Sequence, residues 1–200
     1  MPAITELPPL DWTGEPGSAE YDDASGTLVL RSRAGVDWIN YAHGGGQHAA
    51  TALTFAEPDG DFMFSARVRV EGDRSTFDAA VLALWSDPDH WAKLCFEYSP
   101  HHQGMVVSVV TDGLSDDCNS TVVVDPDVHL RISRRDRAYA FHSSRDGITW
   151  DFVRYFALAT GTGPMRVGFL AQCPTGAGCT AVFDGIRLDA TTLADLRSGV

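Results

Sequence analysis

Short segments rich in β-branched and aromatic residues recur along the whole chain, with turn signals between them. The turns include Pro-Asp-Gly-Asp at 58–61, Arg-Asp-Gly at 145–147 and Gly-Thr-Gly-Pro at 161–164. Their glycine and proline residues supply the positive or fixed φ angles that tight reversals need. This pattern is typical of a β-sandwich or barrel and differs from a βα alternation. We therefore predict an all-β chain.

The expected elements follow from the same pattern. Two hundred residues suit one domain, 1–200, because the sheets of a sandwich share one core. Helical periodicity occurs only in Thr191–Arg197, where Leu193 and Leu196 are three apart, and predicts a short C-terminal helix. Strands are expected near residues 27–31, 36–41, 50–55, 61–70, 78–85, 91–98, 104–111, 120–124, 128–134, 138–143, 149–156, 165–171 and 181–188.

The segment 92–98 alternates cleanly. Leu94, Phe96 and Tyr98 share one face of the predicted strand, which places Lys93 and Glu97 on the other. Four strand positions separate these two charges by about 13 Å, so each needs another partner. They are either solvated surface charges or groups that flank a ligand site.

The balance of charge excludes several classes of partner. The chain has 15 basic and 27 acidic residues, a formal net charge of -12, which repels nucleic acid and anionic lipid surfaces. The sequence has no leader-like start and no apolar stretch of membrane-spanning length, so we expect a cytoplasmic protein with reduced cysteines. A hairpin disulfide between Cys173 and Cys179 is the alternative left open.

Several segments carry a family resemblance. They are Phe77–Leu82, Asp89–Tyr98, Ser108–Thr111, Leu130–Ile132, Ser144–Trp150 and Val167–Gln172. From Trp38 to Leu188 the chain resembles the DUF1349 family, also called "regulation of enolase protein 1"-like. Ala80 stands where relatives usually have glycine, and Asp117 stands where they have the tryptophan of a Ser-Asp-Trp motif. The resemblance implies a two-sheet jelly roll, a β-sandwich of the concanavalin A-like lectin/glucanase superfamily, in which many members hold carbohydrate on a concave face.

Catalysis and metal binding have little support in the sequence. Enzymes of that superfamily carry a Glu-x-Asp-x-Glu arrangement, which this chain lacks, although a pair from separate strands such as Asp78 with Glu97 stays open. His43 and His48 flank a triple glycine, a poor frame for a preformed metal site. We therefore assign no catalytic residue, no metal site and no cofactor.

The leading hypothesis is a non-catalytic binding domain for a saccharide or another small polar ligand. Indoles stack on the C–H faces of sugars, whereas carboxylates and ammonium groups bind hydroxyls. Tryptophans are also large core residues, the role expected here for Trp12 and Trp150. One alternative is an interaction or regulatory module that docks onto a partner enzyme or forms a homodimer, and another is a glycoside-processing enzyme. The predicted ligand-binding residues on the concave sheet and its rim are Trp38, Asp78, Trp91, Lys93, Glu97 and Asp116.

Overall fold

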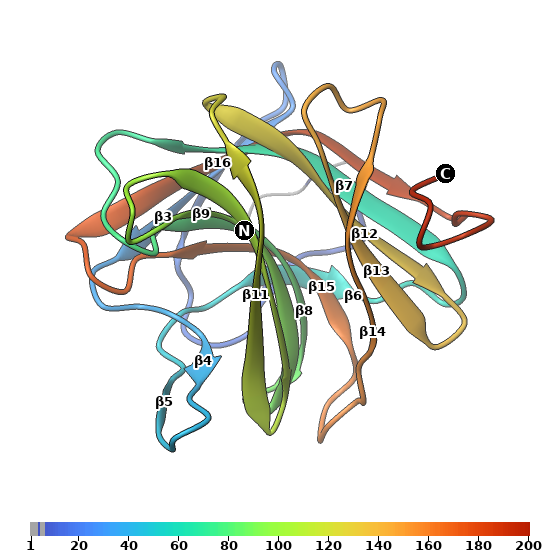
Figure 1. Cartoon of the computed structure of the whole chain (residues 1–200), viewed down its shortest axis with the longest axis horizontal. Helices are drawn as coiled ribbons and strands as arrows, with labels where there is room; N and C mark the ends of the chain where they lie inside the picture. The colour runs from blue at the N-terminus through green and yellow to red at the C-terminus, as the bar shows by residue number, and fades with distance from the viewer. Residues whose placement is uncertain (1–3, 5–6) are drawn as a thin grey trace.

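Two large antiparallel sheets face each other in the computed structural model, which describes residue 4 and residues 7–200 (Figure 1). Each sheet has seven strands. In order, sheet A contains β1 (Asp11–Trp12), β6 (Leu53–Ala56), β15 (Arg166–Gln172), β8 (Ala79–Asp87), β9 (His90–Tyr98), β10 (Gly104–Asp112) and β11 (Leu114–Val123). Sheet B contains β14 (Asp151–Ala157), β13 (Ala138–Ser144), β12 (Asp127–Arg135), β7 (Phe62–Glu71), β16 (Gly178–Asp189), β3 (Thr27–Arg33) and β2 (Ser18–Asp22). The predicted two-sheet all-β fold is confirmed.

The main core lies between the sheets and follows the alternation of the strands. On β7 the residues Phe62, Phe64, Ala66 and Val68 are buried, while Arg67 between them is exposed. Phe64 packs edge-on against aromatic rings of sheet A, with 5.2 Å between its ring centroid and that of Phe169. Edge-to-face packing of this kind is the favoured geometry of buried aromatic pairs.

A second apolar layer covers part of the outer face of sheet A. The segment 36–52, which includes the short strands β4 (Ile39–Asn40) and β5 (Gly46–Gln47), places Trp38 and Ala52 against Val81 and other residues of that face. The indole nitrogen of Trp38 donates a hydrogen bond to the Ala50 carbonyl oxygen at 2.8 Å. Small residues on β8 let this segment approach the sheet closely. The outer face is therefore only partly open to solvent.

The predicted C-terminal helix is wrong. In the described chain, residues 191–200 form turns that lie on the outer face of sheet B. Leu193 and Leu196 are buried there, as their spacing suggested. Their backbone is held by side chains of the sheet: Arg131 donates to the Gly199 carbonyl at 2.7 Å, and His142 Nε2 donates to the Leu196 carbonyl at 2.8 Å. Carbonyl groups that accept from the sheet do not need helical partners.

Other sequence expectations differ in detail. The strands β1 and β2 were not expected, and β11 begins at Leu114 instead of near Ser120. Trp12 packs against the main core. The guanidinium of Arg131 lies over the Trp150 ring, with its Cζ atom 4.2 Å from the ring centroid. The four cysteines are free thiols, three of them buried.

Candidate functional site

A buried lysine is the centre of the candidate site. The alternation of β9 turns Lys93 to the outer face of sheet A, where it is 2% exposed. Its Nζ donates to Asp37 Oδ1 at 2.7 Å, to the Trp38 carbonyl at 2.8 Å and to Gln172 Oε1 at 2.9 Å. These three acceptors use the three N–H donors of an ammonium group. Burial by itself lowers the pKa of Lys93, but the Asp37 carboxylate outweighs it and raises that pKa.

Gln172 connects this lysine to Glu97. The Gln172 Nε2 group donates to Glu97 Oε2 at 3.2 Å and to the Phe77 carbonyl at 2.9 Å, while its Oε1 accepts from Lys93. The side-chain amide of Gln172 thus bridges Lys93 and Glu97, whose backbones we predicted to be too far apart for a direct ion pair. Each charge has the additional partner that its strand position required. We call Asp37, Lys93, Glu97, Asp117 and Gln172 the polar patch.

Glu97 is half-buried, and its burial raises the pKa of its carboxyl group to about 7. The negative charges of Asp37 and Asp117 act in the same direction, whereas Lys93 opposes them. Cys95 lies between Lys93 and Glu97 on the strand, and burial holds the pKa of its thiol well above the ordinary value. Near neutral pH the Glu97 carboxyl group is therefore partly protonated, whereas Cys95 remains a neutral thiol.

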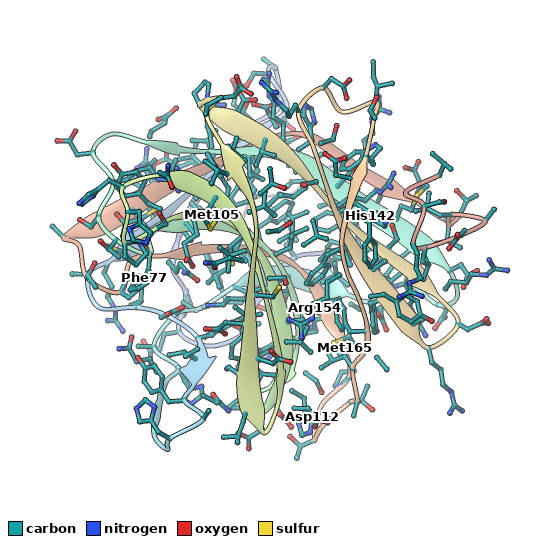
Figure 2. All side chains as sticks on the ribbon, in the orientation of Figure 1. Phe77, Met105, Asp112, His142, Arg154 and Met165 are labelled. Atoms are coloured by element: carbon teal, nitrogen blue, oxygen red, sulfur yellow. The ribbon has the colours of Figure 1, made fainter. Side chains whose placement is uncertain are left out.

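Asp117, and not the predicted Asp116, belongs to this face. In the sheet, Val109 pairs with Lys93 on one side and with Asp117 on the other, so the three share one face. Asp117 is exposed at the edge of sheet A, and partial desolvation raises its pKa. Asp116 points the other way and accepts a hydrogen bond from Arg154 at 3.0 Å. Arg154, marked in Figure 2, comes from β14, so this contact joins the edges of the two sheets.

An exposed aromatic residue is joined to the polar patch through its backbone carbonyl group. Phe77 lies two residues before the start of β8, is 39% exposed and has a φ of 69°. A left-handed backbone is uncommon for a bulky residue and costs of order 1 kcal/mol or more. It is held by a 2.7 Å hydrogen bond from the Phe77 N–H to the Tyr98 carbonyl and by the bond from Gln172. Met105, labelled with Phe77 in Figure 2, lies opposite Glu97 on β10.

The two predicted tryptophans have a different position from the one expected. Trp38 and Trp91 are both 0% exposed, and their ring centroids are 5.9 Å apart in the apolar layer on sheet A. The indole N–H of Trp91 donates to the Pro88 carbonyl at 3.0 Å. A ring with no exposed area presents no face to a ligand. In this structure both residues are packing groups beneath the site, not stacking surfaces.

Asp78 also lies away from the polar patch. It is 1% exposed, and its Oδ2 accepts from the Ser75 N–H at 2.8 Å. Burial and the adjacent Asp78 carboxylate raise the pKa of the Cys173 thiol to about 11. Asp78 therefore belongs to a buried cluster at the end of the sandwich. Of the six predicted site residues, the structure places only Lys93 and Glu97 in the patch.

Three members of the patch were not singled out from the sequence, nor was Phe77. Gln172 and Phe77 lie within the segments that carried the family resemblance, and Asp37 directly precedes Trp38. Asp117 was noticed only as a departure from the family pattern. The side chains of Asp37 and Gln172 meet Lys93 across long stretches of sequence, so local spacing gave no signal for these contacts.

The described part of the chain contains no group of three or more His, Cys, Asp or Glu side chains arranged to hold a metal ion. Likewise, no helix in residue 4 and residues 7–200 has the length and apolar character needed to cross a bilayer.

The fold resembles several solved structures. A functionally unknown protein from Saccharomyces cerevisiae is 24% identical with a TM-score of 0.79. The match covers 93% of this chain and 97% of the yeast chain. Xylan β-1,4-xylosidase from Bacillus halodurans C-125 is 15% identical with a TM-score of 0.71; the match covers 94% of this chain but only 38% of the xylosidase. The carbohydrate binding module CBM66 from Bacillus subtilis is 14% identical with a TM-score of 0.53. The match covers 89% of this chain and 94% of the module. These likenesses show a shared fold.

Sequence comparison identifies the family directly. Among curated proteins none matches the chain. The family model described as "Protein of unknown function (DUF1349)" matches residues 12–191, which is most of the sequence and includes every residue of the polar patch. The chain therefore belongs to the DUF1349 family.

Proposed function

We propose that this protein is a non-catalytic binding domain, and that the polar patch holds a saccharide or another small polar ligand on the outer face of sheet A. The observation that carries the proposal is the Lys93–Gln172–Glu97 network, which is built around a buried ammonium and ends at a half-buried carboxyl group. The network fixes the position of Glu97, because Gln172 is itself held by two further hydrogen bonds. A preorganised acceptor binds a hydroxyl group with little loss of conformational freedom.

The chemistry of the patch favours hydroxyl-bearing ligands. Three carboxyl groups interact electrostatically with the ammonium of Lys93: Asp37 contacts it directly, and Glu97 and Asp117 lie farther away. This excess of acceptors disfavours an anionic ligand and suits a neutral one that donates O–H groups. Asp37 also keeps some exposed area but is paired with Lys93, so Glu97 and Asp117 are the groups that a ligand would contact.

Phe77 supplies the apolar part of the proposed site. A sugar ring presents C–H groups that pack on an aromatic face. Phe77 keeps its side chain exposed next to the patch at the cost of an unfavourable backbone conformation. Strained backbone conformations often occur at functional sites, so the positive φ of Phe77 beside the polar network supports a functional role for this residue. The structural likeness to a carbohydrate binding module is consistent with this role.

Titration calorimetry with neutral hexasaccharides of xylose, arabinose and glucose tests the proposal. The wild-type protein should bind at least one of them, with modest affinity because only one aromatic side chain contributes. Asp117→Asn and Phe77→Gly should each weaken that binding about tenfold. The expected factor corresponds to the loss of one charge-assisted hydrogen bond or of one ring contact.

Asp116→Asn is the matched control, since it makes the same exchange one residue away on the opposite face. It should leave the affinity unchanged. Equal losses from Asp116→Asn and Asp117→Asn would show that the ligand does not recognise this face. An absence of heat with all three hexasaccharides would reject the saccharide proposal.

A second candidate, self-association, is favoured by the exposed sandwich edges. Edge strands β11 and β14 lie on the same side of the molecule (Figure 1), and exposed apolar side chains gather on and beside them. They are Leu114, Val122, Val124, Ile148, Phe152 and Tyr155. Edge strands with apolar groups pair readily with a second copy. Sedimentation equilibrium decides this case: a dimer that dissociates on Val122→Lys supports it, and a monomer at all concentrations rejects it.

A further inference from the structure

Residues 191–200, which we call the strap, cross the outer face of sheet B in a series of turns. Within the described part of the chain, the strap forms no backbone–backbone hydrogen bond with either sheet. Three side chains of β12 and β13 hold it by donating to its carbonyl groups: Arg131, Arg135 and His142. Its apolar contact comes from two leucine side chains. The strap can therefore detach without breaking any strand pairing.

His142 is the most deeply buried of these three anchors. Its side chain is 0% exposed, and its Nε2 lies 2.8 Å from the Leu196 carbonyl oxygen. A carbonyl oxygen only accepts, so Nε2 carries the proton of the neutral ring and Nδ1 keeps the lone pair. Nδ1 is shielded from solvent and has no hydrogen-bond partner among the described residues. A second proton on His142 must therefore bind an atom that has neither water nor an acceptor beside it.

The groups that face His142 do not compensate a positive charge. Arg131 lies directly opposite in the pairing of β12 with β13, is 7% exposed, and no carboxylate of the described residues offsets its charge. Phe152 of β14 presents an aromatic ring, and Asp195 and Arg197 of the strap are exposed to solvent. Burial first, and then the charge of Arg131, lower the pKa of His142 to about 4, although the hydrogen bond to the strap opposes them.

Protonation of His142 and closure of the strap therefore oppose each other. Once the strap leaves the sheet, water reaches His142 and Arg131 and solvates both charges. We propose that the strap is an acid-sensitive cover, which detaches from sheet B when His142 takes up a proton. Detachment uncovers His142, Arg131 and Ser65, which form one row across the sheet. Acid thus exposes a cationic surface on a protein whose formal net charge is -12.

The direction and size of the effect follow from the pKa of His142 in the two states. Under the closed strap this pKa is about 4, and it returns to its ordinary value of 6.5 when the ring is in water. The closed state therefore loses stability as pH falls from 6.5 towards 4, and it is unaffected above that window. From pH 7 to pH 5, the ratio of open to closed strap should rise about 20-fold.

Native-state proteolysis with thermolysin measures this ratio. The protease cuts before leucine, and Leu193 and Leu196 are buried while the strap is closed. Cleavage then tracks the population of the open form. Rates are normalised at each pH to those of a free peptide with the sequence of residues 189–200. The normalised rate of the wild type should rise about 20-fold from pH 7 to pH 5.

His142→Gln keeps an N–H donor for the Leu196 carbonyl but takes up no proton, so its normalised rate should be the same at both pH values. His101→Gln, at an exposed position, is the control and should behave as the wild type does. A flat wild-type profile, an equal rise in His142→Gln, or cleavage of the strap only together with the strands would overturn the inference.

If His142→Gln does not fold, the titration of the His142 ring by NMR decides the question in the wild type. A ring that titrates at its ordinary pKa while the strap stays uncut would overturn the inference. A ring that takes up its proton as cleavage of the strap increases would support it. The strap lies on sheet B and the polar patch on sheet A, so this inference and the proposed function can fail separately.

Discussion

Replacing Glu97 by glutamine should stabilise the protein above neutral pH. In the folded state, burial raises the pKa of Glu97 from 4.5 to about 7. Between these two values the folded state keeps a proton that the unfolded state releases. Stability must therefore fall as pH rises through this window, and the penalty is complete above the folded-state pKa. Below about pH 4.5 both states are protonated, and the penalty is absent.

The size of the effect follows from the pKa difference. The shift from 4.5 to about 7 is 2.5 units. At about 1.4 kcal/mol per pH unit it corresponds to an upper limit of roughly 3.5 kcal/mol at pH 8. Glu97 keeps some solvent contact, so about 1–3 kcal/mol is the expected gain in the free energy of unfolding for Glu97→Gln. The glutamine carbonyl can still accept the hydrogen bond from Gln172.

Urea unfolding at intervals from pH 5 to pH 8 measures this gain. The difference between Glu97→Gln and wild type should be small at pH 5 and should grow towards pH 8, because other titrating groups cancel in the comparison. Asp59→Asn, in an exposed turn, is the control and should show no such trend. A difference that is independent of pH, or a variant that is less stable at pH 8, would refute the reasoning about Glu97.

Three further substitutions test the packing around the site. Lys93→Met leaves the partly buried Asp37 carboxylate without its cation, and it should lower the free energy of unfolding by about 2–4 kcal/mol in urea titrations at pH 7. Trp38→Ala empties a fully buried site and should cost about 3–5 kcal/mol by the same measurement; a stable variant would show that the indole is not a core group. Phe77→Gly removes left-handed strain, so its melting temperature should be unchanged or higher, and a clear decrease would mean that the ring is structural.

The parts of the site that lie on one strand could be predicted from the sequence. The alternation of residues 92–98 correctly separated Leu94 and Phe96, which face the main core, from Lys93 and Glu97 on the opposite face. That inference needs only the period of a strand. Many short strands and their turns likewise indicated an all-β chain, whereas the two-sheet arrangement was implied by the family resemblance.

The contacts across the sheet could not be predicted in this way. Gln172 reaches Lys93 from β15, and Asp37 reaches it from the segment that covers sheet A. The choice between Asp116 and Asp117 depends on the register of β11, whose first half was not recognised as a strand. The leucine spacing near the C-terminus predicted burial correctly but the wrong backbone, because sheet B side chains hold that segment in turns.

The most direct test of the ligand-binding account is to map the binding surface by amide chemical shifts. The wild-type protein is titrated with xylohexaose or with the hexasaccharide that calorimetry selects. The account predicts saturable shifts that cluster on β9, on β11 near Asp117 and around Phe77. Saturable shifts confined to other faces of the sandwich, or no shifts at all, would contradict the claim that the Lys93–Gln172–Glu97 network is a ligand site.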